Sequence, residues 1–248
     1  MNTIVYLNHW TGNGPAALTG GDVPAAIAEP LYALHRLELA AVRALLVPAN
    51  TDQRYLLSQQ ARLEAWLLAG GTMVFNGHVA YPFLRWLAPF VPGPARGIEG
   101  LRLHRAQAHP VFDGVDPEHL TFRRGVAGFY ARGGNPPPAG ACVLHTLGPD
   151  AVPVDWVLSL PGGGRLLTHS GNDMWMYAGS ADSTCRIVPQ LFDWLRGGRH
   201  DPRRPFRSDP ARAGDRRAGR RHLLPPSHLP HTGVGAVHRS GDLPAGAG

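Results

Sequence analysis

The sequence has no lysine, only two cysteines and no long apolar run, and each of these features narrows its class. Cys142 and Cys185 do not imply a disulfide framework. No stretch approaches the roughly 18–20 apolar residues of a membrane helix. The first residues, MNTIVYLNHW, contain neither a basic segment nor a small-residue cleavage site. We therefore expect a cytoplasmic protein with no membrane partner.

The formal net charge of +6 comes entirely from the end of the chain. Residues 199–248 contain 10 arginines and 4 aspartates, whereas residues 1–198 contain 14 arginines and 14 acidic residues. Arginines in such a tail could neutralise phosphates. The larger part of the chain is neutral, however, so its composition does not favour nucleic acid as a partner.

The composition also changes at Gly198. The first 198 residues are long enough for one domain with a sizeable core. The rest is dominated by Arg, Pro, Gly, Ala and His and has almost no apolar periodicity, so it cannot bury enough surface to offset its ordering entropy. We predict an α/β domain over residues 1–198 and a disordered tail over residues 199–248.

Hydrophobic patterning predicts the elements of this domain. Apolar runs indicate strands over 3–8, 44–48, 72–78, 141–147, 154–160 and 165–170. PGGG (161–164) indicates a hairpin turn between the last two. Residues 101–105 indicate an edge strand and 123–130 a further strand, whereas 25–43 are ambiguous. Helices are predicted over 53–69, 81–88 and 181–196, the first capped by Thr51 or Asp52. The order of these elements predicts a three-layer α/β sandwich with a flavodoxin-like, mostly parallel sheet and a late β-hairpin.

Polar residues follow the ends of four predicted strands. Because ligands gather at the carboxyl ends of strands in open α/β sheets, we expect these residues to converge on one rim. Each of them alone also fits a capping or turn role, so the set rather than any member indicates a site. The set consists of His9, Trp10, Asn50, Asp52, Asn76, His78, His169, Asn172 and Asp173.

The sequence gives no firm sign of a metal or cofactor. His9, His78, His169 and Asp173 are residue types that bind zinc or iron, but no close ligand spacing such as H-E-x-x-H occurs. TGNGPA (11–16) matches a dinucleotide-binding turn only superficially, because Pro15 and the following ALTGGD interrupt the helix that such a turn must open. We expect no metal and no cofactor.

Several short motifs are shared with a known superfamily. LLVPANTDQ (45–53), GGTMVFNGH (70–78), HPVFDGV (109–115) and VPVDWVLSLPGGGRLLTHSGNDMW (152–175) follow one another along the chain. This arrangement resembles the class I glutamine amidotransferase-like superfamily, and most closely its trehalose-utilisation (ThuA-like) branch. His78, His109-Pro110, Gly163–Arg165 and Asn172-Asp173 stand at the branch's motif positions. The resemblance covers about residues 1–198 and implies the same α/β fold.

The chain departs from that superfamily at the catalytic elbow. Amidotransferases of this kind carry a nucleophilic cysteine after the third strand and a His-x-Glu further on. Here the elbow reads Phe75-Asn76-Gly77-His78, and no His-x-Glu follows. Neither Asn76 nor His78 can replace a thiolate in acyl transfer. We therefore expect no cysteine-dependent glutaminase chemistry.

Three functions remain open at this stage. The leading hypothesis is a protein that binds a small polar, sugar-like ligand through His9, Trp10, Asn50, Asp52, Asn76 and Asn172. The second is a hydrolase or isomerase in which His78 or His169 is the general base and Asp52 or Asp173 orients it. The third is a non-catalytic structural or regulatory module. Homo-oligomer formation is compatible with all three.

Overall fold

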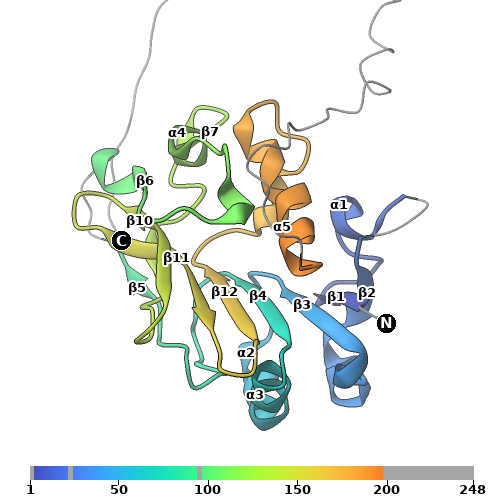
Figure 1. Ribbon diagram of the computed structural model, residues 1–248. Coiled ribbons are helices and arrows are strands. Elements are labelled where there is room, and N and C mark those ends of the chain that lie inside the picture. The colour runs from blue at the N-terminus through green and yellow to red at the C-terminus, as the bar shows by residue number, and fades with distance from the viewer. Residues whose placement is uncertain (1–2, 22–24, 94–96, 198–248) are drawn as a thin grey trace, which may run out of the picture. The chain divides into compact units, whose positions relative to one another are not determined.

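A mixed eight-stranded sheet organises the chain in the computed structural model, which describes residues 3–21, 25–93 and 97–197 (Figure 1). The strands stand in the order β2-β1-β3-β4-β12-β11-β10-β6. In chain order they are β1 Thr3–Asn8, β2 Ile27–Pro30, β3 Val42–Val47, β4 Thr72–Asn76, β6 Leu103–Arg105, β10 Cys142–Leu147, β11 Val152–Ser159 and β12 Arg165–His169. The predicted disorder of residues 199–248 lies outside the described residues.

The sheet is parallel from β2 to β12 and antiparallel from β12 to β6. The order β2-β1-β3-β4 is the flavodoxin-like order, in which the chain first moves to one side of β1 and then to the other. β11 and β12 form the late hairpin, and Gly163 in its turn has φ of +83°. The predicted fold class, a mostly parallel α/β sandwich with a late hairpin, is confirmed.

Helical segments cover both faces of this sheet. The α-helices are α1 Ala16–Thr19, α2 Gln53–Ser58, α3 Gln60–Leu68, α4 Pro117–Thr121 and α5 Ile187–Leu195. The 3-10 helices are η1 Leu31–Arg36, η2 Leu39–Ala41, η3 Glu99–Leu101, η4 Pro110–Phe112, η5 Met174–Tyr177 and η6 Ser183–Arg186. Figure 1 shows α2 and α3 on one side of the sheet and α5 on the other.

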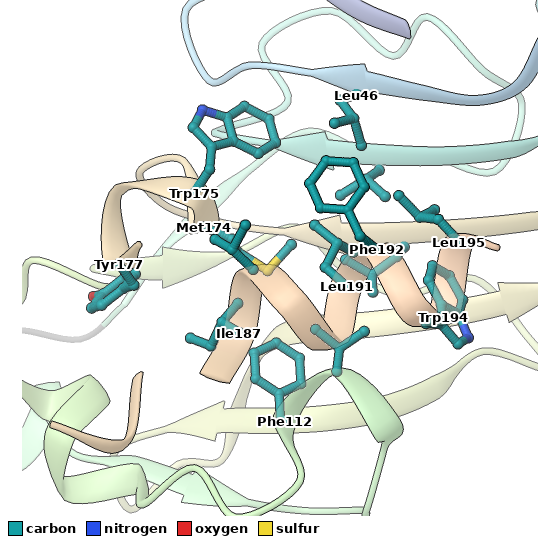
Figure 2. Packing of buried hydrophobic residues seen from close by; sticks show 14 of the residues in the cluster. Leu46, Phe112, Met174, Trp175, Tyr177, Ile187, Leu191, Phe192, Trp194 and Leu195 are labelled. Carbon is teal, nitrogen blue, oxygen red and sulfur yellow. The ribbon is translucent and has the colours of Figure 1, made fainter. Parts of the chain in front are cut away.

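Successive strand residues enter two separate hydrophobic cores. In β1, Ile4 and Tyr6 belong to the core beneath α5, whereas Val5 and Leu7 belong to the core beneath α2 and α3. Strands buried on both faces are continuously apolar, which is why these runs could be recognised in the sequence. In Figure 2, the apolar side chains of α5 lie between Leu46 of β3 and Phe112 of η4.

The predicted helix over 53–69 is present but interrupted. Gln59 separates α2 from α3 with φ of −101° and ψ of 8°, outside the helical region. Asp52 is the N-cap, because its Oδ1 accepts a hydrogen bond of 3.0 Å from the backbone N–H of Tyr55. Gly70, with φ of +108°, lies just past the end, as a left-handed C-terminal glycine should.

The predicted helix over 81–88 is wrong. This segment is irregular, although Phe83, Leu84 and Leu87 are buried in the core beneath α3. The backbone N–H of Arg85 donates to Glu64 Oε1 at 2.7 Å, and the guanidinium of Arg85 pairs with the same carboxylate. A contact with α3, distant in sequence, therefore replaces the local helical hydrogen bond.

Two other segments differ from expectation. The ambiguous stretch 25–43 contains the edge strand β2 followed by η1 and η2. The strand predicted over 123–130 is instead a small hairpin of β7 Phe122–Arg123 and β8 Val126–Ala127. Its two turn residues, Arg124 and Gly125, both have positive φ, as a type I′ turn requires. The remaining small sheet pairs β5 Val91–Pro92 with β9 Gly133–Gly134.

Two arginines donate to backbone carbonyls in or next to the 3-10 helices η1 and η4. The guanidinium of Arg62 on α3 donates to the carbonyls of Leu34 and Leu37 at the end of η1. Nη2 of Arg105 on β6 donates to the carbonyls of both Phe112 and Val115 around η4. The forked guanidinium suits two neighbouring acceptors, whereas an ammonium is a point charge.

The capping role of Asp52 can be tested by substitution. Asp52→Ala should lower the free energy of unfolding by about 1 kcal/mol, because the N–H of Tyr55 loses its acceptor. Asp52→Asn should stay close to the wild type, since asparagine caps equally well. Urea unfolding of the three proteins measures this. An equal loss in both variants would contradict the capping role and point to the charge instead.

Candidate functional site

The reversal of strand order at β1 places a site at the carboxyl ends of β1 and β3. In flavodoxin-like sheets a crevice opens where the chain turns to opposite sides of its first strand. Here the chain leaves β1 through residues 9–15 and leaves β3 through residues 48–52. A pocket of about 520 Å³ lies at this point, and its volume is within the range of small-molecule sites. It is lined by Tyr6, residues 8–15, Asn50 and Asp173.

The loop that follows β1 is shaped by Asn8. The side chain of Asn8 accepts a hydrogen bond from the N–H of Trp10 at 3.1 Å and donates to the carbonyl of Gly12 at 2.6 Å. A Cβ atom on Gly14 would lie 2.9 Å from the ring of Tyr6, and Gly14 has φ of +78°. A glycine is thus needed where the loop passes over Tyr6, and the loop forms one wall of the pocket.

Asp173 joins the pocket from the segment after β12. Its Oδ1 accepts from the backbone N–H of Ala49 at 2.7 Å, and its Oδ2 accepts from the indole N–H of Trp175 at 3.0 Å. Burial raises the pKa of Asp173, although these two hydrogen bonds and the charge of His169 act in the opposite direction. The carboxylate therefore links the ends of β3 and β12 and faces the pocket that it lines.

Two further titratable groups line the same pocket. Burial and the nearby charge of Asp173 raise the pKa of Tyr6 to about 12, so its phenol stays protonated. Burial lowers the pKa of His9, which favours its neutral form. Both ring nitrogens of His9 are buried and have no hydrogen-bond partner among the described residues. The ring of Trp10 lies 5.1 Å from that of His9, and Trp10 is 70% exposed.

The structure thus brings together four of the nine residues that the sequence placed at the rim. His9, Trp10, Asn50 and Asp173 line the pocket. Asn76 lies inside the fold and is fully buried: its Oδ1 accepts from the N–H of Met174 at 3.2 Å. Asn76 therefore fixes the start of η5 instead of facing a ligand.

The other predicted residues lie apart from this lining. Asp52 caps α2 and also accepts from the hydroxyl of Tyr32 at 3.0 Å. Asn172 is exposed and donates to the carbonyl of Phe129 at 2.8 Å. His78 is exposed and stacks on Phe90 with ring centroids 3.6 Å apart. Burial and the charge of His169 lower the pKa of His78.

His169 lies in a buried polar network that the sequence did not reveal. Its Nδ1 is 2.6 Å from Asp155 Oδ1, and Nδ1 of His145 is 2.8 Å from Asp155 Oδ2. The hydroxyl of Tyr130 donates to the same Oδ2 at 2.7 Å. The side chains of His145, Asp155 and His169 are fully buried. The only sequence signal was a polar residue inside each of three apolar strands.

Protonation in this network follows from its geometry. An ionised carboxylate can only accept hydrogen bonds, so both Nδ1 atoms must carry protons. Burial alone would raise the pKa of Asp155, but the charge of His169 and the hydrogen bonds from both histidines hold it well below its usual range. His169 is fully buried, and neither it nor His78 lines the pocket beside Asp173. The catalytic role predicted for these three residues therefore stays a prediction.

A second hollow, of about 540 Å³, lies over α3 and is shallow. It is lined by Gln60, Ala61, Glu64, Ala65, Leu68 and Arg85. The charged groups in it, Glu64 and Arg85, are already paired with each other. The charged groups of this surface are therefore less available to a ligand than the polar groups of the pocket between β1 and β3.

Metal ligands and thiols do not gather in the described part of the chain. Within residues 3–21, 25–93 and 97–197, no group of three or more His, Cys, Asp or Glu is placed to hold a metal ion. Both cysteines are free and half-buried, and neither lines the pocket. Among the described helices, none has the length and apolar character needed to cross a membrane.

Comparisons with known proteins give little beyond this geometry. No protein-family model matches the chain, and no curated protein matches it. Among solved structures, the chain is similar to the mmIFT52 N-terminal domain, over 80% of this chain and 99% of that one. The sequence identity is 12% and the TM-score is 0.46, a likeness too weak to support a functional argument.

The buried network can be tested through Asp155. Asp155→Asn should lower the free energy of unfolding by about 3–5 kcal/mol at neutral pH, because three buried donors lose an ionised acceptor. The exposed cap Asp116→Asn is the control and should stay within about 0.5 kcal/mol of the wild type.

The difference in unfolding free energy between the wild type and Asp155→Asn should depend on pH. The pKa of Asp155 is lower in the folded than in the unfolded chain, so its stabilisation is complete above the unfolded value of about 4 and falls below it. The difference between wild type and Asp155→Asn should therefore narrow as the pH falls below about 4. Denaturant unfolding across this range measures it, and a constant difference would contradict an ionised Asp155.

Proposed function

We propose that this chain is a binding protein for a small polar ligand, which it holds in the pocket between the ends of β1 and β3. The observation that carries this proposal is the pocket itself, with His9 in its wall. Both nitrogens of that ring are buried without a protein partner among the described residues. Buried polar groups in proteins are usually hydrogen-bonded, so this ring is left with unused donor and acceptor capacity beside the pocket.

Other lining residues support a polar, sugar-like ligand. Asn13, Asn50 and Asp173 offer donors and acceptors for hydroxyl groups. Trp10 presents a largely exposed ring beside them, and aromatic rings pack against the apolar faces of such ligands. A few convergent polar groups beside aromatic surface are typical of small-molecule sites.

Membership of the amidotransferase-like superfamily, near the ThuA-like branch, is part of the same proposal. The elbow at 75–78 has no cysteine, and Asn76 in it is occupied by backbone contacts. Both features agree with a superfamily member that binds a ligand without glutaminase chemistry. The cytoplasmic location, the absence of nucleic-acid partners and the oligomeric state stay predictions.

The alternative functions have less support. A hydrolase or isomerase that uses His78 or His169 needs one of these rings beside the substrate. Neither lines the pocket, and His169 is fully buried. A structural or regulatory module remains the second candidate, and it is favoured if the pocket binds nothing.

A ligand screen on the full chain tests the proposal. Sugars, polyols, amines and small carboxylates are screened by thermal shift, and hits are measured by calorimetry. We expect Trp10→Ala and His9→Ala to weaken a genuine hit by about tenfold, because each removes a contact of roughly 1–1.5 kcal/mol. Tyr81→Ala, an exposed aromatic residue outside the pocket, is the control and should leave affinity unchanged. A screen without hits, or hits indifferent to Trp10 and His9, would overturn the binding function.

A further inference from the structure

The charges around the pocket are unbalanced. Asp173 is the one acidic residue in the lining, and no arginine stands among the described residues that line it. This is notable because residues 1–198 contain as many arginines as acidic residues. In the described part of the chain, the hydrogen-bond donors to Asp173 are the backbone N–H of Ala49 and the indole of Trp175, both neutral.

A partly buried carboxylate without a cationic partner is costly to keep ionised. Removing a carboxylate from water is unfavourable unless an opposite charge or several hydrogen bonds compensate for it. The two neutral donors and the more distant charge of His169 compensate only in part, since burial still raises the pKa of Asp173. A cation that entered the pocket would supply the missing charge.

The neighbouring groups also suit a cation. Tryptophan is the best aromatic partner for an organic cation, and Trp10 is exposed at the pocket. Burial lowers the pKa of His9 in the same lining and favours its neutral form, so this ring does not repel a cation. An anionic ligand would meet Asp173 with no arginine in the described lining to offset the repulsion.

We propose that the ligand of this pocket carries an ammonium group, which pairs with Asp173 and contacts the ring of Trp10. This inference rests on the proposed binding function and adds the charge class of the ligand. A metal ion fits less well, because one carboxylate and one imidazole are too few ligands for a protein metal site, and the described residues hold no larger group.

Matched pairs of charged and neutral probes test the inference. Calorimetry on the full chain at neutral pH compares choline with its neutral isostere dimethylbutanol, ethanolamine with ethylene glycol, and glucosamine with glucose. We expect the ammonium member of at least one pair to bind at least about tenfold more tightly than its partner, as a hydrogen-bonded charge pair allows.

Substitutions assign the preference to Asp173. Asp173→Asn should remove most of the preference for the ammonium member while leaving the affinity for the neutral member similar. Asp116→Asn changes the same charge at an exposed helix cap and should have no effect. Trp10→Ala, in an exposed loop residue, should weaken ammonium binding severalfold, and it keeps the test valid if Asp173→Asn does not fold.

The outcomes separate this inference from the function on which it rests. If neutral probes bind as tightly as ammonium probes, or if the broader screen finds only neutral or anionic ligands that depend on Trp10, the ammonium inference is overturned and the binding function stands. If neither the pairs nor the screen yields binding, both are overturned. A preference for ammonium that survives both Asp173→Asn and Trp10→Ala also overturns the inference.

Discussion

The carboxylate of Asp155 holds together the part of the sheet that changes direction. It receives hydrogen bonds from His145 on β10 and His169 on β12, and in the sheet it lies directly opposite both residues. Tyr130 adds a third hydrogen bond from the loop that crosses this region. The other ring nitrogens, Nε2 of His145 and of His169, are buried without a hydrogen-bond partner among the described residues, so the histidines are held only from the Asp155 side. The register of three strands is therefore tied to one side chain.

This fixed register has consequences at the end of β12. His169 is the last residue of β12, and its carbonyl accepts from Gly77 after β4 at 2.8 Å. Four residues later, Asp173 reaches the backbone of Ala49 after β3 at 2.7 Å. The position of the pocket carboxylate thus depends on where β12 ends. The ends of β3, β4 and β12 are joined by hydrogen bonds made by neighbouring residues, which gives the pocket a pre-formed wall.

The sequence predicted strands and helices correctly where the local hydrophobic pattern matches the burial of the segment in the fold. The central strands β1, β3 and β4 are buried on both faces, so their apolar runs were recognisable, whereas the half-exposed edge strand β2 was not. The false helix at 81–88 shows the opposite case, because Glu64 takes the backbone N–H of Arg85 from another element. Strand ends suggested His9, Trp10, Asn50 and Asp173, and these four residues line one pocket. Nothing local could show that Asn76 turns inward or that Tyr6, which resembles a core residue, lines the pocket.

The two arginines that each donate to two backbone carbonyls affect how the fold behaves at alkaline pH. Arg62 binds two carbonyls at the end of η1, and Arg105 binds two around η4. Lysine in such positions would begin to lose its proton, and with it a donor, as the solution approaches pH 10 or so. A guanidinium stays protonated well beyond that point. In a chain without lysine, these tertiary contacts therefore keep their donors in alkali.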